Sequence, residues 1–233
     1  MKDFSNRYIF TFSLVMVVSV AILLSLTALL LQPKQEKNIE VEKKMNILSS
    51  INVISEKNSA VQLYGKFIRD SYVINTEGKH IEGVDAFTVG LRAEQKKTVA
   101  DQNLPVFIAV MDNGDTLHIF PIEGKGLWGP IWGYVALKPD MSTIAGVTFD
   151  HKGETPGLGA EINTTTFESQ FLNKGIYENG KFVSIKVVKG GADPSNLHEV
   201  DAISGGTITS KGLEAMVHDG LIKYEKFFTE NRK

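Results

Sequence analysis

An uninterrupted apolar stretch near the N-terminus constrains this chain more than any other feature. Residues 8–31 read YIFTFSLVMVVSVAILLSLTALLL, 24 residues without a charged side chain. As an α-helix this stretch would extend about 36 Å, more than the roughly 30 Å hydrocarbon core of a bilayer. A cleaved signal peptide would normally have a shorter apolar core, of about 7–15 residues. The sequence therefore predicts an uncleaved transmembrane helix that follows a short tail, residues 1–7.

The charges on either side of this stretch leave its orientation open. Lys2 and Arg7 precede it, whereas four lysines follow it among three glutamates, between residues 32 and 44. Cytoplasmic flanks usually carry an excess of Lys and Arg, and neither side has a clear one. Pro33 marks the end of the membrane segment, and residues 32–60 are predicted to form a charged helical connector. Its apolar residues recur at steps of three, as expected for a helix that docks on a domain or acts as a stalk: Met45, Leu48, Ile51 and Ile54.

Composition excludes several classes of site and partner. The chain has no cysteine, which excludes disulfides, thiolate-bound metals and cysteine-ligated iron–sulfur clusters. Its formal net charge is −2 and its pI is about 6.2, so a nucleic-acid partner is not expected.

The remainder, residues 61–233, is predicted to be one α+β domain with an antiparallel sheet. Residues 104–111 and 116–122 flank Asp-Asn-Gly-Asp, a strong hairpin signal, and residues 132–138 and 143–151 indicate a second hairpin. Strands and helices mix without βαβ alternation, which favours α+β over a doubly wound sheet. Three more elements are expected: a short helix over 164–175, with Thr164 or Thr165 as its cap and Gly175 as its stop, a strand over 181–188, and a closing amphipathic helix over 213–228.

Three glycine-rich segments are candidates for the functional site. The first, residues 124–133 (GKGLWGPIWG), contains both tryptophans, Trp128 and Trp132. Two indoles among glycines could line one side of a planar ligand, or could be core side chains at a tight turn. Composition by itself favours the tight turn.

The second segment, residues 151–161 (HKGETPGLGAE), follows a predicted strand. Backbone amides near Gly157 and Gly159, with the Thr155 hydroxyl, could hydrogen-bond a heteroaromatic ring or a phosphate. The alternative is a Pro-Gly turn that binds no ligand and has solvent-exposed charged side chains. His151, Glu154 and Glu161 lack the spacing of a metal site, and no metal is expected.

The third segment, residues 201–210 (DAISGGTITS), precedes the predicted closing helix. Thr209 or Ser210 would suffice as that helix's cap, which leaves Ser204, Gly205, Gly206 and Thr207 without an assigned role. These residues could form an anion site at a helix N-terminus. The segment is not a P-loop, because no lysine follows its glycines at the required position.

Taken together and in this order behind a membrane helix, these segments resemble one protein family. It is the FMN-binding C subunit of the Na⁺-translocating NADH:quinone reductase, related to the G subunit of the Rnf electron-transport complex. The family's flavinylation motif is Asp-x-x-Ser/Thr-Gly-Ala-Thr, and residues 201–207 read DAISGGT. Gly206 stands where alanine is usual. The resemblance covers nearly the whole chain.

The resemblance implies a set of cofactor residues. It places FMN on Thr207 through a phosphoester, with Asp201 needed for attachment and Ser204, Gly205 and Gly206 around the phosphate. It places the ring against the loop that contains Glu154, Thr155, Gly157, Leu158 and Gly159, with Trp128 nearby. Residues 61–233 would then be the FMN-binding domain. No catalytic residue and no metal ligand are implied on this chain.

The function implied is that of an electron carrier within a larger enzyme, without a complete active site of its own. The implied partners are the A, B, D, E and F subunits of the complex, and a flavin transferase that moves FMN from FAD. Because that transferase acts outside the cytoplasm, the resemblance implies a single-pass protein of the bacterial inner membrane with its FMN domain on the periplasmic side.

Three other functions are weighed against this one. The G subunit of an Rnf complex would differ in its neighbouring subunits. A membrane-anchored sensor or binding module would carry no flavin. A free-standing flavin reductase would need a nicotinamide site, and the chain has no Rossmann fingerprint to supply one.

Overall fold

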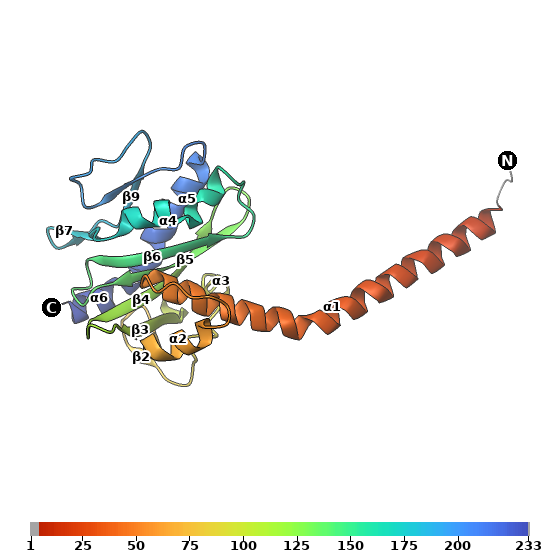
Figure 1. The fold of residues 1–233 in the computed structure, drawn as a ribbon, viewed down its shortest axis with the longest axis horizontal. Coiled ribbons are helices and arrows are strands. Elements are labelled where there is room, and N and C mark those ends of the chain that lie inside the picture. Colours follow the sequence, from red (N-terminus) through yellow and green to blue (C-terminus); the bar gives the residue numbers. More distant parts are fainter. Residues whose placement is uncertain (1–4, 233) are drawn as a thin grey trace. The chain divides into compact units, whose positions relative to one another are not determined.

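The structure is a computed structural model that describes residues 5–232. Of the predicted tail, residues 1–4 lie outside the described residues. The chain divides into two compact units, Met1–Lys43 and Lys44–Lys233. The second unit is the folded domain that contains all three glycine-rich segments (Figure 1).

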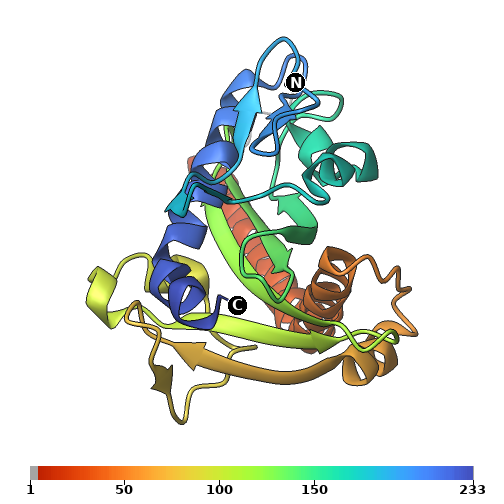
Figure 2. The same ribbon diagram turned by 90° about the vertical axis from the view of Figure 1, so that its left-hand side faces the viewer.

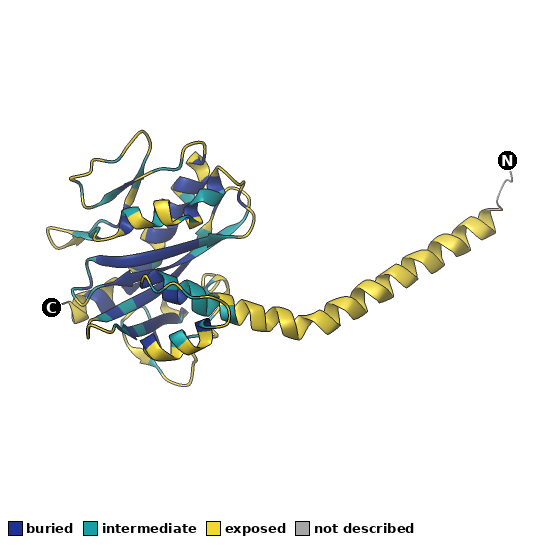
Figure 3. Cartoon of the chain, in the orientation of Figure 1, coloured by how far each residue is buried: buried dark blue, intermediate teal, exposed yellow. Residues whose placement is uncertain are grey.

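A single helix, α1 (Asn6–Ser50), contains the predicted transmembrane stretch. It is long and apolar enough to cross a membrane, with a mean hydropathy of 2.8 over its most apolar window. Every described residue before Glu40 is exposed (Figure 3). The helix continues through Pro33 without a break and ends at Ser50, short of the predicted end of the connector at residue 60.

The last turn of α1 belongs to the folded domain. Ile47, Leu48 and Ile51 are at most 1% exposed, and they pack with Phe107 and other side chains of the sheet. The apolar residues predicted at steps of three therefore dock on the domain, apart from Ile54, which is 95% exposed. After the helix Asn52 takes a positive φ of 61°, and the chain then turns into α2 (Ala60–Phe67).

One six-stranded sheet organises the domain, with strand order β2-β1-β3-β4-β5-β6. All of its neighbouring strands are antiparallel. The two predicted hairpins are confirmed. Its strands are β1 (Ile68–Ile74), β2 (His80–Ile81), β3 (Leu104–Val110), β4 (Thr116–Lys125), β5 (Pro130–Leu137) and β6 (Ile144–His151).

Helices cover both faces of this sheet. Alternate residues of each strand point to opposite faces, so each strand contributes side chains to both packing layers. Ile119 and Ala136 pack with α2 and the end of α1, whereas Phe120 and Leu137 pack with the C-terminal helices. Figure 2 shows these two groups of helices on opposite sides of the sheet. The fold is therefore α+β, as predicted.

The closing helix begins earlier and is less regular than expected. It consists of α5 (Thr207–Leu221), a 3-10 turn η4 (Ile222–Tyr224) and α6 (Glu225–Asn231). α5 lies close against β4: a Cβ added to Gly124 would fall 2.6 Å from Met216, and one added to Gly220 would fall 2.5 Å from Ile122. These glycines let the helix that starts at Thr207 approach the sheet directly.

The helix expected over 164–175 is shorter than predicted. It is only α4 (Thr165–Glu168) followed by η3 (Ser169–Phe171), although Thr164 does cap it by accepting the Phe167 N–H. The chain leaves η3 through Asn173, whose φ is 61°, so Gly175 is not the stop.

The strand expected over 181–188 is divided in two. β8 (Lys181–Phe182) pairs with β7 (Tyr177–Glu178), and β9 (Lys186–Val188) pairs in parallel with β10 (Glu199–Asp201). Ser184 takes a φ of 60° between them. The N–H groups of Val183 and Ser184 both point at the Ile176 carbonyl, which turns the chain. The remaining short element is η2 (Gly159–Asn163), next to the second glycine-rich segment.

A half-buried carboxyl group ties α4 to β6. Glu168 Oε1 accepts the backbone N–H of Phe149 at 2.7 Å. Burial, with a smaller contribution from the nearby Asp150, raises the pKa of Glu168 from 4.5 to about 7. The folded protein therefore holds this proton at pH values where the unfolded chain has lost it. The resulting stabilisation is complete below pH 4.5 and is lost as the pH rises through about 7.

We predict that Glu168→Gln removes this pH dependence while it keeps an oxygen acceptor for Phe149. Between about pH 5 and pH 8, the free energy of unfolding should fall by about 1 kcal/mol less in the variant than in the parent, a value reduced for solvent screening. Chemical denaturation at both pH values checks this. Glu178→Gln, at an exposed position, serves as the control, and parallel profiles for Glu168→Gln and the parent would contradict the assignment.

Candidate functional site

The three glycine-rich segments meet around one buried carboxylate. Glu154, just after β6, is 4% exposed. Its Oε1 accepts the backbone N–H of Trp128 at 2.9 Å, from the first segment. Its Oε2 accepts the hydroxyl proton of Thr209 at 2.5 Å, from the third. Glu154 therefore joins all three segments by side-chain hydrogen bonds.

Hydrogen bonds within the second segment fix the loop that contains Glu154. The Glu154 backbone N–H points at His151 Nδ1, 3.2 Å away. Gly157 donates its N–H to Glu161 Oε1 at 3.0 Å, and the N–H groups of Leu158 and Ala160 share the Thr155 carbonyl. The 154–161 turn is thus closed by backbone hydrogen bonds and by the carboxylate of Glu161.

The acidic and imidazole side chains of this segment do not converge as metal ligands. His151, Glu154 and Glu161 make no metal centre, and no group of three His, Asp or Glu side chains placed to hold a metal occurs among residues 5–232. The Glu154 oxygens are used instead by the hydrogen bonds between the segments.

Glycine is required where the segments approach Glu154. A Cβ on Gly126 would fall 2.5 Å from Glu154 Oε1, and one on Gly159 would fall 2.5 Å from Glu154 Oε2 and overlap the Thr209 hydroxyl. Real side chains do not approach so closely. These two glycines therefore make room for the carboxylate and its hydrogen bonds.

The hydroxyls of the third segment divide into buried and exposed ones. Thr209 is 1% exposed and donates to Glu154, and Ser210 is 2% exposed and accepts the Ile203 N–H at 3.1 Å. Ser204 and Thr207 are exposed. Among these hydroxyls, only Ser204 and Thr207 are open to modification.

Thr207 is the first residue of α5, and Gly206 occupies the N-cap position. Within the described part of the chain no side chain caps this helix, so the expectation that Thr209 or Ser210 would do so is wrong. The helix starts at Thr207 and places both inside its first turn, facing the protein. The positive end of the helix dipole and its first amides therefore lie next to the exposed Thr207.

Beside Thr207 lies a shallow cavity of about 220 Å³. It is formed by all three segments. Of the residues expected at the site, Glu154, Thr155, Leu158, Gly159, Gly205, Gly206 and Thr207 line it. Gly205 has a φ of +73°, and a Cβ there would fall 2.5 Å from Leu158 Cδ2, so this turn both needs glycine and contacts the second segment.

Four expected residues lie outside the cavity lining: Trp128, Gly157, Asp201 and Ser204. Trp128 reaches the site through its backbone, while the residue as a whole is 70% exposed. Trp132 is only partly buried. The interpretation of the first segment as a turn with two core tryptophans is therefore wrong, because Trp128 is mostly exposed.

Asp201 is engaged with the backbone of another loop. Its Oδ1 accepts the N–H of Ala192 at 2.6 Å, and its own N–H donates to Gln170 Oε1 at 2.7 Å. It thereby anchors the end of β10 and the loop after β9, just before the exposed turn that leads to Thr207.

Sequence reasoning assigned Thr209 to the helix cap rather than to the cavity, and it missed two apolar residues of the cavity lining, Leu127 and Ile208. They are 46% and 58% exposed. Each is an apolar residue directly beside a predicted site residue, Trp128 or Thr207, and this adjacency is the one sequence signal that could have pointed to it.

Comparisons with known proteins match the same part of the chain. The FMN-binding domain family matches residues 126–222. The C subunit of the Na⁺-translocating NADH-quinone reductase of Vibrio anguillarum is 32% identical over 210 residues, which are 83% of this chain and 82% of that protein. The corresponding protein of Haemophilus ducreyi is 30% identical over 221 residues, 87% and 86% of the two chains.

Solved structures show the same similarity. The crystal structure of the C subunit from Parabacteroides distasonis has a TM-score of 0.79 and 40% identity, and the match covers 85% of this chain and 97% of that one. The crystal structure of Shewanella oneidensis NqrC has a TM-score of 0.71 and 29% identity, with 82% and 96% covered.

We predict that Gly159→Ala lowers the free energy of unfolding by about 1–3 kcal/mol, because the new methyl group meets the buried Glu154 and Thr209 side chains. Gly153→Ala is the matched control, since a Cβ there has nothing within 4 Å. Denaturant titration of both variants checks this. Equal stability of the two variants would show that the contact between the segments is looser than described.

Proposed function

The chain belongs to the C-subunit family of Na⁺-translocating NADH-quinone reductases, and from this premise we propose that it carries a covalent FMN on Thr207 and relays electrons between redox centres of its partner subunits. The observation that carries the proposal is the position of Thr207. This residue is exposed at the N-terminus of α5, beside a cavity formed by the three segments of the site.

The residues around Thr207 fit a phosphate ester. Gly205 and Gly206 bring backbone close to the Thr207 hydroxyl, and the positive end of α5 favours the negative charge of a phosphate. Thr209 is the other threonine of the segment, and its hydroxyl already donates a hydrogen bond to Glu154. Burial thus supports Thr207 as the acceptor over Thr209.

The cavity also has room for the part of FMN that lies next to the phosphate, and the rest of the cofactor would lie at the protein surface. Thr155, Leu158 and Gly159 line one part of it, with Leu127 and Ile208 elsewhere in its wall. In this proposal Glu154 supports the cavity, and Thr155, Leu158 and Gly159 contact the ring, with Trp128 at its rim. The N–H groups of Gly157 and Leu158 are used within the turn itself, so they do not bind the ring. When bound, FMN supplies reversible acceptance of one or two electrons; the protein binds and orients it.

Attachment requires a second protein. A threonine hydroxyl is a weak nucleophile, and the nearby carboxylates Glu154 and Asp201 are engaged with other partners among residues 5–232. We propose that a flavin transferase supplies the catalysis: the Thr207 oxygen bonds to the FMN phosphorus of FAD, the pyrophosphate bond breaks, AMP leaves and the hydroxyl proton passes to the transferase or to water. Asp201 contributes by fixing the segment before Thr207, and Ser204 lies within the exposed turn that the transferase must recognise.

The proposed partners, membrane anchor and orientation of the domain rest on membership of the family. The relatives named above belong to an NADH-quinone reductase that translocates Na⁺. We propose that this chain assembles with the A, B, D, E and F subunits, that residues 8–31 anchor it in the bacterial inner membrane, and that its FMN domain faces the periplasm. NADH oxidation and quinone reduction take place on the partners. Similarity to these relatives over more than four-fifths of the chain supports this assignment over an Rnf-type protein.

We predict that co-expression with a flavin transferase gives a single FMN adduct that maps to the peptide containing Thr207. Thr207→Ala should abolish the mass increase, because it removes the acceptor oxygen, while Thr166→Ala, at an exposed threonine of α4 outside the cavity lining, should retain it. Intact-protein mass and peptide mapping check this. An adduct that survives in Thr207→Ala would move the linkage to another residue and refute the assignment.

We predict that Thr155→Val keeps the covalent flavin but shifts its absorption bands and midpoint potential. Loss of a hydrogen bond to a charged ring is worth about 1.5–3 kcal/mol, which a redox titration resolves. Thr166→Val, at an exposed position of α4 outside the cavity lining, is the control. If Thr155→Val leaves both spectrum and potential at the parent values, the ring does not lie against this loop.

A further inference from the structure

Lys211 is an exposed cation on α5 that forms no salt bridge among the described residues. The helix turns Leu213, Met216 and Val217 toward the core, whereas Lys211 lies on its solvent side. The salt bridges found among residues 5–232 involve other basic side chains. The Lys211 ammonium group is therefore available to an anionic ligand.

The acidic residue nearest to Lys211 along α5 is used elsewhere. Glu214 lies three residues later, a spacing at which side chains on a helix are neighbours. Its Oε2 accepts the backbone N–H of Val187 at 2.7 Å, on β9. One turn in the other direction lies Thr207, which is exposed. Within one turn of α5 on either side, Lys211 thus has the Thr207 hydroxyl beside it and no unengaged carboxylate.

Helix geometry brings the Lys211 side chain to Thr207. Four residues of an α-helix advance about 6 Å along its axis and return to within about 40° of the starting direction. Both residues lie on the exposed side of α5. Side chains of a helix lean toward its N-terminus and cover the turn that precedes them. The long lysine side chain therefore extends over the turn that carries the Thr207 hydroxyl.

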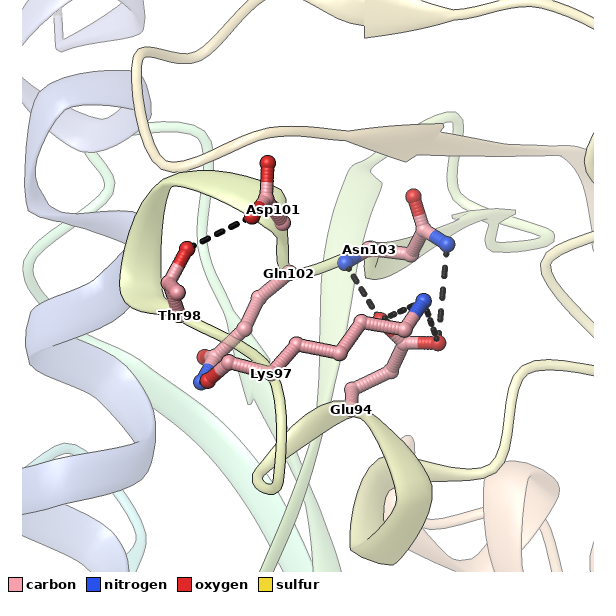
Figure 4. Close-up of polar contacts among 6 residues, drawn as sticks. All are labelled: Glu94, Lys97, Thr98, Asp101, Gln102 and Asn103. Atoms are coloured by element: carbon pink, nitrogen blue, oxygen red, sulfur yellow. Dashed lines mark hydrogen bonds and ion pairs between the residues drawn. The ribbon is translucent and has the colours of Figure 1, made fainter.

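A pair of this kind occurs elsewhere in the chain. Residues 91–103 contain α3 (Leu91–Glu94) and η1 (Val99–Asp101). Lys97 follows Glu94 by three residues, and its Nζ lies 2.8 Å from Glu94 Oε2 (Figure 4). The lysine extends back to the acidic group that precedes it. An anionic group on Thr207 would stand in the same order before Lys211, with the acid first, which is the more favourable order on a helix.

The cavity beside Thr207 lies on the other side of this hydroxyl. Ile208 and Thr209 line the cavity, whereas Lys211 is not among its lining residues. A phosphate on Thr207 would therefore have the flavin on its cavity side and the ammonium group on its solvent side. As a diester this phosphate keeps one negative charge, which the first amides of α5 compensate only in part.

We propose that Lys211 binds the phosphate that joins FMN to Thr207 and holds it against the first amides of α5. This inference rests on the proposed attachment of FMN at Thr207. The ammonium group donates a charge-assisted hydrogen bond to a phosphate oxygen. This contact limits rotation about the ester bonds and so directs the flavin toward the cavity. Lys211 is a positioning residue and takes no part in the chemistry of attachment.

The effect of flavinylation on thermal stability tests this proposal. The full-length parent and Lys211→Met are each prepared in detergent, with and without co-expressed flavin transferase. In 0.1 M NaCl, flavinylation should raise the Tm of the parent by about 2–4 °C more than that of Lys211→Met. In 1 M NaCl this difference should fall below about 1 °C, because the Debye length shrinks to about 3 Å. Equal effects in both proteins, or a difference that 1 M NaCl leaves unchanged, would overturn the proposal.

Two further variants separate the charge of Lys211 from its bulk and from other lysines. Lys211→Arg keeps the positive charge and should retain the parent effect of flavinylation. Lys181→Met, at an exposed position of β8, should also behave as the parent. The neighbouring Phe182 contacts His218 of α5, which lies roughly 16 Å along the helix axis from Thr207. A loss in Lys181→Met as large as that in Lys211→Met would show a general effect of net charge and refute the pairing.

Intact-protein mass separates this inference from the flavin proposal. Lys211→Met should still acquire FMN on Thr207, because the transferase supplies the catalysis. An adduct on Thr207 with equal effects on Tm contradicts the role of Lys211 and leaves the flavin proposal standing. Absence of the adduct from the parent contradicts the flavin proposal and this inference together. An adduct missing only from Lys211→Met would assign the lysine to recognition by the transferase and overturn its role as the phosphate partner.

Discussion

The hydrogen bonds of one buried carboxylate, Glu154, hold the candidate site together. Its two oxygens take a backbone N–H from the loop after β4 and a hydroxyl proton from the first turn of α5. A buried carboxylate without such partners would be strongly destabilising. Each of the three segments is therefore stabilised by the position of the other two. The requirement for glycine at residues 126 and 159 follows from this constraint, because a side chain at either position would meet the carboxylate oxygens.

The same constraint separates the two threonines of the third segment. The hydrogen bond from Thr209 to Glu154 turns Thr209 toward the protein interior and so fixes the rotation of α5 about its axis. Thr207, two residues earlier, therefore lies on the exposed side of the helix. The helix begins with Gly206 at its cap position, which has no side chain to place over the first amides. In the proposed function, the phosphate of FMN takes the place that a capping side chain would have taken. The anchor for the cofactor is thus part of the helix geometry, and the ring-binding loop is fixed to it through Glu154.

The sheet and the segments of the site could be predicted well from the sequence, because their signals are local. The Asp-Asn-Gly-Asp turn and the alternation around it define β3 and β4, and clusters of glycine mark the three segments. Features that depend on contacts between residues far apart in the sequence could not be predicted from it. The role of Glu154 depends on Thr209, 55 residues away, and this contact places Thr209 inside the helix rather than at its cap. The break in the strand at Ser184 depends on the Ile176 carbonyl, and the anchoring of Asp201 depends on Ala192.

The central claim is that the Glu154–Thr209 hydrogen bond couples the loops of the site. A double-mutant cycle with Glu154→Ala, Thr209→Val and the double variant measures it directly as a coupling free energy of unfolding. We predict a coupling of at least about 1.5 kcal/mol, the value for a buried hydrogen bond to a charged group. Losses that add to within about 0.5 kcal/mol would show that the two side chains act independently, and would contradict this account.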